Sequence, residues 1–575
     1  MDEKNVAVEK NTAALKKTKM TTIGVVALIF SFIAAGAFGI EEAIAASGPG
    51  VTIAMLIIFP VVWSFPLCEM VSELGSIYPC EGGVYSWARE AFGEFWGWQA
   101  GLWGALTTWM CQAQYVVLVV GYLAKLLEMN TFTEYAVKIG VVAVFTIINI
   151  IGLDWMEKLE TVIMVLIIAA FGAVTIVGFT HWNYNPIMPL FNPEEGLFHS
   201  VGDGIAVIIW MYLGYECMSN MAEEIEDPQV IPKAMRIANP IIALSYVLPT
   251  LAALAAIGSW DAWSTEQGGG AVGYADVLIQ YVGSWAGTAF IIIAIIANCS
   301  IFCSYIAHGS RAFFVMADDH MFPKAMCKVD KRGIPVVSIL LLAVFTIFTC
   351  QFDFTTLVMA TNPIQLYLYL LMVACVLKIR KHYPISARKK MGLTYMAGGN
   401  TGLYLSSICV VAISMFAIYV NGLDYFLTGF IVVIGGALVY VIFKRIYKGR
   451  YLDDPELFPL NKQTGLGVGD MGDLGVYLMC GGLMAFLGTA FIYFYEAEFG
   501  VEYYLEENET GLLSNFYGML GACLIIGVIL LVAGYIAYKV GKKQDGAKLA
   551  ELKAAREAEM DDRIREIHGD VPIER

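Results

Sequence analysis

Charged residues are scarce in this sequence. Aspartate, glutamate, lysine and arginine together make up 15% of the 575 residues, whereas hydrophobic residues make up 58%. A typical soluble domain carries about 25% charged residues. This composition excludes a soluble globular protein and indicates a polytopic protein embedded in a lipid bilayer.

The sequence also lacks the signatures of common enzymes. It contains no H-E-x-x-H motif, no Walker glycine loop, no G-x-S-x-G motif and no soluble domain that could hold a nucleotide. The twelve cysteines form no C-x-x-C pair and mostly lie within apolar runs, as Cys111 and Cys523 do. We therefore predict no enzymatic activity, no metal and no cofactor. Basic residues form no patch with interleaved aromatic residues, so we predict no nucleic-acid partner.

What the sequence does contain is apolar segments of membrane-spanning length. A helix crosses roughly 30 Å of hydrocarbon with about 20 residues, and by this criterion we count fourteen spans. The predicted protein is all-α. Its predicted parts are an N-terminal tail (1–20), spans one to five (21–180), spans six to ten (199–378), spans eleven and twelve (400–445), two additional spans (473–540) and a charged helical tail (541–575).

Lysine and arginine cluster in alternate loops, which indicates the orientation of the chain. They follow spans six, eight, ten and twelve, whereas the other loops are almost free of them. The positive-inside rule therefore places both termini in the cytoplasm of a multi-pass protein of the cell membrane. The C-terminal tail carries acids as often as bases, so we expect a solvated helix or a contact with another protomer.

The first span interrupts its own helical pattern. An apolar start at 23–30 is followed by GAFGIEE at 36–42, and the apolar pattern resumes at 43–46. Glycines loosen a helix, and carboxylates are costly at membrane depth. Irregular backbone is tolerated there only where it lines a cavity. We interpret this stretch as a broken helix that faces a substrate cavity; the alternative is an early helix end at the outer interface.

The sixth span repeats this peculiarity, with YLGYE at 212–216 interrupting an apolar start. The two breaks lie five spans apart, and an odd number of spans inverts the second group relative to the first. Spans one to five and six to ten are therefore candidate halves of an inverted repeat. Interrupted helices at matching positions of two halves indicate the midplane binding site of a secondary transporter.

Five stretches resemble motifs of the amino acid–polyamine–organocation (APC) transporter superfamily, in particular its polyamine and LAT-like branch. They are AGAFGIEEA with SGP (35–49), PCEGGVY (79–85), YLGYE (212–216), EEIEDP with IPKA (223–234), and SR through MFP (310–323). The resemblance implies the five-plus-five inverted-repeat (LeuT-like) fold, with alternating access between the two faces.

The sequence departs from the family pattern at two positions. Amino-acid transporters of the family usually grip the substrate carboxylate with a glycine cluster, but Phe38 occupies that cluster here and Glu41 follows it. This departure favours recognition of an amine. Some members carry a proton-coupling lysine midway along the fifth helix; our alignment places Ile167 there, and the nearest lysine is Lys158.

We predict that Glu41 binds the ammonium group of a substrate and that Glu216 is a second amine contact or a gating acid. Trp210, Tyr212 and Tyr215 are candidates for an aromatic cage, because ring faces attract cations. For each side chain the alternative is a structural role in packing or capping. The remaining predicted substrate-binding residues belong to the two breaks and to spans three and eight: Gly36, Ala37, Phe38, Gly39, Ile40, Gly214, Trp109, Gln112, Asn298 and Tyr305.

These predictions indicate a secondary active transporter of small organic amines, namely polyamines, diamines or cationic amino acids. The expected partners are the substrate, the lipid bilayer, and either a coupling ion (H⁺ or Na⁺) or a counter-substrate. The alternatives are a neutral amino acid permease or exchanger of the same family, and a transporter-like nutrient sensor that binds the same ligand.

Overall fold

The computed structural model describes residues 20–569 except for residues 35, 125, 128, 153–155, 226, 228, 265–271 and 497–515. Within these residues the chain is helical, with two isolated β-bridges and no sheet. Twelve helices are long and apolar enough to cross a membrane. Two of the fourteen predicted spans correspond to the shorter apolar helices Thr22–Ile33 and Val336–Thr349, so the count of fourteen stays a prediction. The predicted N-terminal tail lies outside the described residues except for Met20.

The helices of the first half lie within residues 22–180. Two prolines fall within the second span, which contains a π-helical turn, η1, between its two α-helical parts. The elements are α1 (Thr22–Ile33), α2 (Ile40–Ser47), α3 (Pro49–Phe59), η1 (Pro60–Ser64), α4 (Phe65–Ile77), the short connector α5 (Val84–Phe92), α6 (Glu94–Ala124), α7 (Thr131–Ile151) and α8 (Met156–Thr180).

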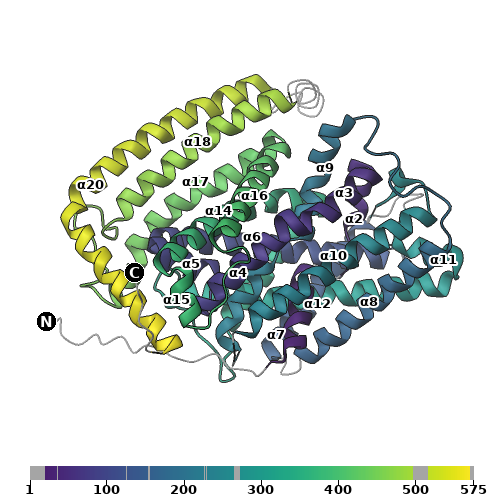
Figure 1. The fold of residues 1–575 in the computed structure, drawn as a ribbon, viewed down its shortest axis with the longest axis horizontal. Coiled ribbons are helices and arrows are strands. Elements are labelled where there is room, and N and C mark those ends of the chain that lie inside the picture. The colour runs from purple at the N-terminus through teal and green to yellow at the C-terminus, as the bar shows by residue number, and fades with distance from the viewer. Residues whose placement is uncertain are drawn as a thin grey trace.

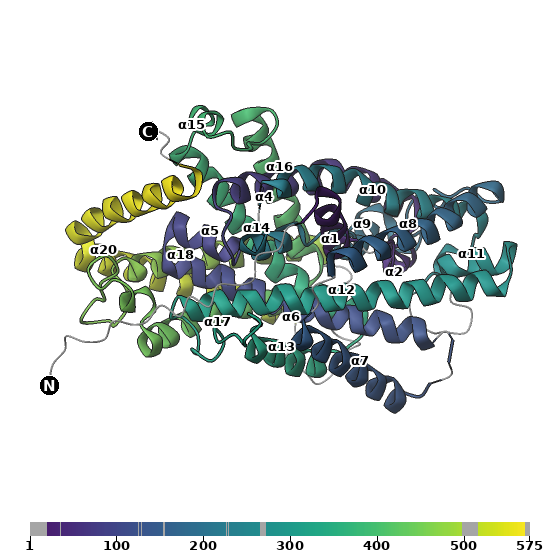
Figure 2. The same ribbon diagram turned by 90° about the horizontal axis from the view of Figure 1, so that it is seen from below.

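The second half begins with another broken helix and ends with one long helix. The elements are α9 (Gly196–Met211), η2 (Tyr215–Glu224), α10 (Val230–Ala256), η3 (Trp260–Ala262), α11 (Tyr274–Tyr281), α12 (Ser284–Asp318), α13 (Val336–Thr349), α14 (Phe354–His382), α15 (Ile385–Lys390), α16 (Gly399–Val420), α17 (Leu423–Tyr447), η4 (Gly449–Leu452), α18 (Asp470–Glu496) and α20 (Phe516–His568). Figures 1 and 2 show these helices as one bundle.

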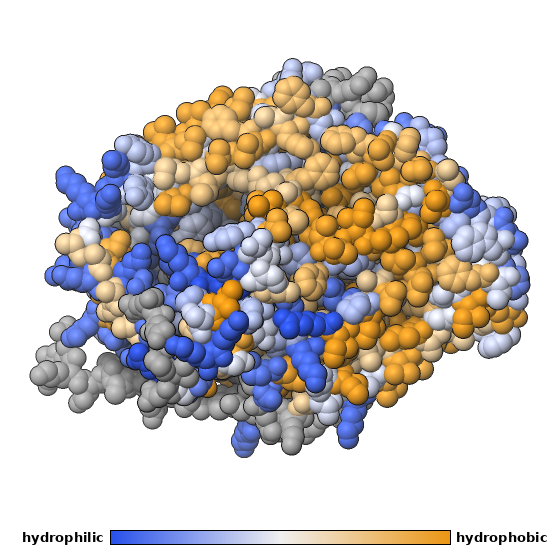
Figure 3. Space-filling view, viewed as in Figure 1, coloured by the Kyte–Doolittle hydropathy of each residue, from blue (hydrophilic) through white to orange (hydrophobic). Residues whose placement is uncertain are grey.

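The surface of the bundle is apolar around its middle and polar at its two ends. Large hydrophobic side chains such as Ile408, Leu438, Phe494 and Ile525 are exposed, as expected of residues that face lipid. Figure 3 shows a broad hydrophobic area between two hydrophilic ends. We call the end at which the C-terminus lies the tail end; the opposite end carries α11 (Figure 1).

The helices α18 and α20 pack closely along their lengths (Figure 1). A Cβ atom on Gly475 would lie 2.4 Å from the backbone nitrogen of Tyr538, and one on Gly534 would lie 2.7 Å from the carbonyl oxygen of Gly475. Small residues thus bring the two backbones together, as is common where helices associate in membranes. Beyond this contact α20 continues as a charged helix.

Candidate substrate site

The two broken helices meet at their interruptions, which confirms the prediction of matching breaks. The backbone of Gly39 has a φ of 96° and that of Gly214 a φ of 100°, conformations that favour glycine. A Cβ atom on Gly214 would lie 2.8 Å from the carbonyl oxygen of Phe32, at the end of α1. The hydroxyl of Tyr246 donates to the carbonyl oxygens of Ile33 (3.1 Å) and Met211 (2.8 Å), and so joins the ends of α1 and α9.

A cavity of about 40 Å³ lies beside the second break, between α5, α6, η2, α12 and α14. This volume holds a few water molecules, so a substrate can enter only if the walls separate. Of the predicted site residues, Gly214, Glu216 and Tyr305 line the cavity. No lysine or arginine belongs to its lining among the residues that the structure describes.

Glu216 supplies the charged group of this cavity. Its side chain is 8% exposed, Gln365 Nε2 donates to its Oε1 (2.6 Å), and the Tyr369 hydroxyl donates to its Oε2 (2.7 Å). The Tyr369 hydroxyl in turn accepts a hydrogen bond from the Gly214 backbone nitrogen (3.3 Å). These partners are neutral. A carboxylate at membrane depth that lacks a positive side chain requires a cationic ligand or a proton.

The imidazole of His308 also lines the cavity and does not balance this charge. Asn220 Nδ2 donates to His308 Nδ1 (2.9 Å), and His308 Nε2 lies 3.2 Å from the Thr108 hydroxyl. A ring nitrogen that accepts a hydrogen bond carries no proton, so this arrangement corresponds to a neutral imidazole. Among the described residues, the cavity is therefore lined by one carboxyl group and by no positively charged side chain.

Glu41 lies outside the lining of this cavity. It is 1% exposed, and its Oε2 accepts a hydrogen bond from the Gly39 backbone nitrogen (2.9 Å) at the start of α2. The Tyr122 hydroxyl donates to its Oε1 (3.2 Å). A carboxylate at a helix N-terminus is stabilised by the helix dipole. In this conformation Glu41 caps its own half-helix, which is the structural alternative considered for it.

A series of aromatic rings runs from the cavity wall to the first break. Tyr305 in the cavity wall contacts Tyr115, whose ring contacts Trp210 (ring centroids 5.3 and 5.8 Å apart). A Cβ atom on Gly39, beside Glu41, would lie 3.2 Å from the Trp210 ring. We call Tyr305, Tyr115 and Trp210 the aromatic layer. Trp210, at one end of this layer, thus contacts the first break beside Glu41, and Tyr305, at the other end, lines the cavity that contains Glu216.

The other predicted aromatic and polar residues lie outside the cavity lining, and all but Asn298 contact a neighbouring helix. The hydroxyl of Tyr212 donates to the Leu56 carbonyl oxygen (3.0 Å), and that of Tyr215 to Asn239 Oδ1 (2.9 Å). The structure therefore does not assemble Trp210, Tyr212 and Tyr215 into a cage. In span three, Trp109 stacks on Phe345 and Gln112 donates to the Tyr305 carbonyl oxygen, while Asn298 of span eight donates to the Ala294 carbonyl oxygen.

The residues of the first break are packed in the protein interior. Phe38 contacts Tyr122, Phe171 and Phe290, with ring centroids 4.8 to 5.9 Å apart. A Cβ atom on Gly36 would overlap the Phe171 ring at 2.2 Å. Ala37 and Ile40 are fully buried.

A further buried carboxylate, which the sequence analysis did not identify, belongs to Glu160 of α8. Three serine hydroxyls donate to it: Ser31 of α1 to Oε2 (2.5 Å), and Ser300 and Ser304 of α12 to Oε1 (2.7 and 2.8 Å). Glu160 is 1% exposed. The sequence feature that could have identified this residue is a glutamate within an apolar, membrane-spanning segment. Ile167, to which our alignment assigned the coupling position, instead lies near Gly36.

Comparisons with known proteins agree with this architecture. The family model "Amino acid permease" matches residues 16–452. A probable polyamine transporter of Arabidopsis thaliana is 26% identical over 80% of this chain and 92% of its own length. The polyamine transporter PUT1 of Oryza sativa is 26% identical over 64% of this chain and 68% of its own length. The branched-chain amino acid permease BcaP of Lactococcus lactis is 26% identical over 52% of this chain and 68% of its own length.

Among solved structures, that of MhsT in complex with L-phenylalanine superimposes with a TM-score of 0.55, at 14% identity, over 72% of this chain and all of that chain. This likeness supports the LeuT-like fold implied by the sequence motifs. The family match covers most of the chain and confirms the predicted resemblance to the APC superfamily. It also agrees with the prediction that the protein is a transporter and not an enzyme. The chain belongs to the amino acid permease family of multi-pass membrane transporters.

Proposed function

We propose that the protein is a secondary active transporter of small organic amines, with polyamines and diamines as the first candidates and cationic amino acids next. The observation that carries the proposal is Glu216, a buried carboxylate with neutral partners in a cavity whose described lining contains no lysine or arginine. A substrate ammonium would supply the missing positive charge. The names of the plant relatives support the same substrate class.

The first break favours an amine over an amino acid. A half-helix N-terminus can hold a substrate carboxylate through its backbone amides. Here the Glu41 carboxylate already accepts a hydrogen bond from the Gly39 nitrogen at the start of α2. A substrate carboxylate would have to compete with this side chain. We propose that Glu41 contributes to amine binding when the aromatic layer opens and admits the second ammonium of a diamine.

Transport requires the cavity to open alternately toward each end of the bundle. We propose that the tail end is cytoplasmic, because the lysine- and arginine-rich loops lie there, and that the membrane is the cell membrane. Opening toward the tail end separates α5 and α6 from η2 and α12. Opening toward the other end displaces the aromatic layer.

Ligand screening tests the substrate class. We expect 1,4-diaminobutane and longer polyamines to raise the melting temperature of the purified protein, because a ligand at 100 times its Kd stabilises the native state by about 2.7 kcal/mol. Butane-1,4-diol, which has the same length and no charge, is the matched control and should give no shift. Stabilisation by neutral amino acids without any effect of amines would support a neutral amino acid permease instead, the function that the similarity to BcaP suggests.

We further propose that Glu160 binds the coupling cation, H⁺ or Na⁺. Its carboxylate and the three serine hydroxyls bring hard oxygen atoms together from α1, α8 and α12. The site touches the half-helix α1, which ends at the first break. Occupation of the site would therefore change how tightly α1 is held against α8 and α12, and so couple the cation to the opening of the cavity.

For the variant Glu160→Gln we expect uptake against a gradient to fall at least about tenfold, while exchange of internal for external substrate persists, because only net transport needs the cation. Proteoliposomes with imposed pH or sodium gradients measure both activities. Glu134→Gln, at the partly exposed start of α7, is the matched control and should behave as the parent protein. Gradient-driven uptake that survives in Glu160→Gln would refute this assignment.

A further inference from the structure

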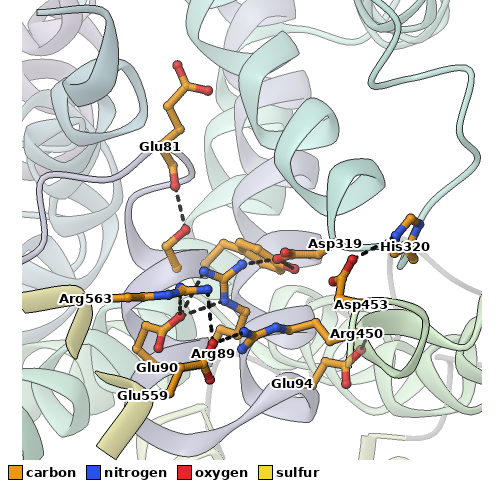
Figure 4. A network of polar contacts seen from close by, with 12 residues as sticks. Glu81, Arg89, Glu90, Glu94, Asp319, His320, Arg450, Asp453, Glu559 and Arg563 are labelled. Carbon is orange, nitrogen blue, oxygen red and sulfur yellow. Dashed lines mark hydrogen bonds and ion pairs between the residues drawn. The ribbon is translucent and has the colours of Figure 1, made fainter. Parts of the chain in front are cut away.

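The charged part of α20 folds back onto the tail end of the bundle. We call residues 545–568 of this helix the tail segment. In it, Arg563 forms an ion pair with Glu90 of α5 (3.0 Å), and Glu559 forms one with Arg450 of η4 (3.0 Å). Figure 4 shows these side chains converging from α5, η4 and α20. The sequence analysis did not predict this docking on the same chain, although other side chains of the segment, such as Glu551 and Arg565, are exposed to solvent as expected.

The tail segment also contacts α4 and α14. The Tyr383 hydroxyl, just beyond α14, donates to Asp561 Oδ1 (2.6 Å), and His382 lies 3.2 Å from the same oxygen. Nε2 of His568 lies 3.0 Å from the carbonyl oxygen of Ile77 at the end of α4. Polar contacts thus tie one helix to the ends of α4, α5 and α14.

These contacts lead by side chains to the substrate cavity. Glu90 pairs with Arg89 (2.9 Å), Arg89 pairs with Asp319 at the end of α12, and Asp319 accepts a hydrogen bond from the Tyr85 hydroxyl (2.6 Å). Tyr85 lines the cavity. Figure 4 shows Arg89 between Glu90 and Asp319. The tail segment is therefore connected to the cavity wall through consecutive ion pairs and one hydrogen bond.

The acids of this connection are ionised. Burial opposes the charge of Asp319, but Arg89 and Arg450 hold the pKa of its carboxyl below the usual value. Burial likewise opposes the charge of Glu90, and Arg89, Arg563 and Arg450 lower the pKa of that carboxyl. The ion pairs therefore persist at neutral pH.

We propose that the tail segment is a latch that opposes opening of the substrate cavity toward the tail end. For the cavity to open, α5 must move away from α12, and Tyr85 must separate from Asp319. The tail segment pins α5 and the end of α14 to one rigid helix, so this separation requires its ion pairs to break as well. Only the transport consequence rests on the proposed function; the opening itself is a property of the fold.

The geometry also indicates how the latch responds to its surroundings. Arg563 and Glu559 are 39% and 31% exposed, whereas Arg89 and Asp319 are 10% and 16% exposed. Salt screens exposed ion pairs much more than buried ones. A rise in ionic strength should therefore weaken the pairs of Arg563 and Glu559 more than the Arg89–Asp319 pair, although their partners Glu90 and Arg450 are each only 9% exposed.

Two cysteines of the cavity wall, Cys111 and Cys217, report its opening. In purified full-length protein in lipid nanodiscs, we expect Arg563→Glu to increase the alkylation rate of Cys217 by N-ethylmaleimide about fivefold, as quantified by peptide mass spectrometry. Arg565→Glu is the matched control: among the described residues, Arg565 pairs with Asp562 of the tail itself, so its replacement should leave the rate unchanged. Buried Cys68 of α4 should react no faster in either variant, which excludes general unfolding.

A reversible restraint completes the test. In Glu90→Cys with Arg563→Cys, a reducible thiol–thiol cross-linker long enough to replace the Arg563–Glu90 ion pair should lower Cys217 alkylation below that of the uncross-linked protein, and reduction should restore the faster rate. Equal Cys217 rates in Arg563→Glu and the parent protein, or an equal increase in Arg565→Glu, would overturn the latch. Faster alkylation in a protein that binds no amine would leave the latch standing and refute the proposed function.

Discussion

Replacing Glu216 with glutamine is expected to reduce uptake of 1,4-diaminobutane at least about 100-fold. The substitution keeps the shape of the side chain and removes its negative charge. Glu216 is the one aspartate or glutamate among the described residues that line the cavity. Loss of one member of a buried, hydrogen-bonded charge pair costs about 2–5 kcal/mol, which corresponds to roughly 30- to 4000-fold in affinity. Uptake of labelled substrate into proteoliposomes and the thermal shift of the purified protein measure the loss.

The fold of this variant should be retained, because glutamine can still accept a hydrogen bond from Tyr369 or Gln365. The informative comparison is Glu41→Gln, which alters a carboxylate outside the cavity lining that caps α2. We expect Glu41→Gln to weaken diamine binding less than Glu216→Gln does. Undiminished binding in Glu216→Gln, combined with a complete loss in Glu41→Gln, would reverse these roles and restore Glu41 as the principal amine contact.

Replacing Glu73 with alanine is expected to cause the largest loss of stability. Glu73 is fully buried at the tail end of α4, where Arg380 forms hydrogen bonds to both of its carboxylate oxygens and Arg388 lies 3.6 Å away. Burial lowers the pKa of Arg388 to about 10 despite the neighbouring Glu73, so this guanidinium already carries a large desolvation cost. Removal of one partner from a buried ion pair costs about 3–5 kcal/mol.

Thermal unfolding followed by size-exclusion chromatography measures this loss, and we expect a melting temperature lower by about 5 °C or more. Glu69→Ala is the matched control. Glu69 lies one turn earlier on α4 and is as buried as Glu73, but its partner Arg236 is 47% exposed and can be hydrated when the acid is removed. Equal destabilisation by the two substitutions would show that burial of the acid, and not the stranded arginines, determines the cost.

The sequence predicted the elements that depend on local patterns. The helical class and the two breaks were visible because glycines and acids interrupt apolar runs at 36–42 and 212–216. The role of Glu41 could not be predicted in the same way. Gly39 adopts a left-handed backbone conformation just before α2 begins, and the Glu41 side chain then turns back and accepts a hydrogen bond from the Gly39 nitrogen. Composition and residue spacing do not indicate the backbone conformation at Gly39 or the direction in which the Glu41 side chain points.

The position of the buried carboxylate of Glu160 illustrates a different limit. Glu160 and Ile167 lie seven residues apart, which is about two helical turns, so they share one face of α8. The position that the alignment compared with a coupling lysine therefore lies on the same face of α8 as the carboxylate proposed to bind the cation, two turns away. The docking of the tail was invisible for another reason: Arg563 pairs with Glu90, which lies 473 residues earlier in the chain, and balanced charge in a helix is equally compatible with solvent.

The close contact of α18 with α20 has a consequence for how the chain is divided. The family match ends at residue 452, before α18 begins, and the cavity and the Glu160 site lie wholly within the matched part. The last two long helices hold each other through their glycines and reach the remainder of the chain partly through the docked segment. They form an accessory pair of helices, which packs through Tyr477 of α18 on a core that already contains every group proposed to handle the substrate and its ion.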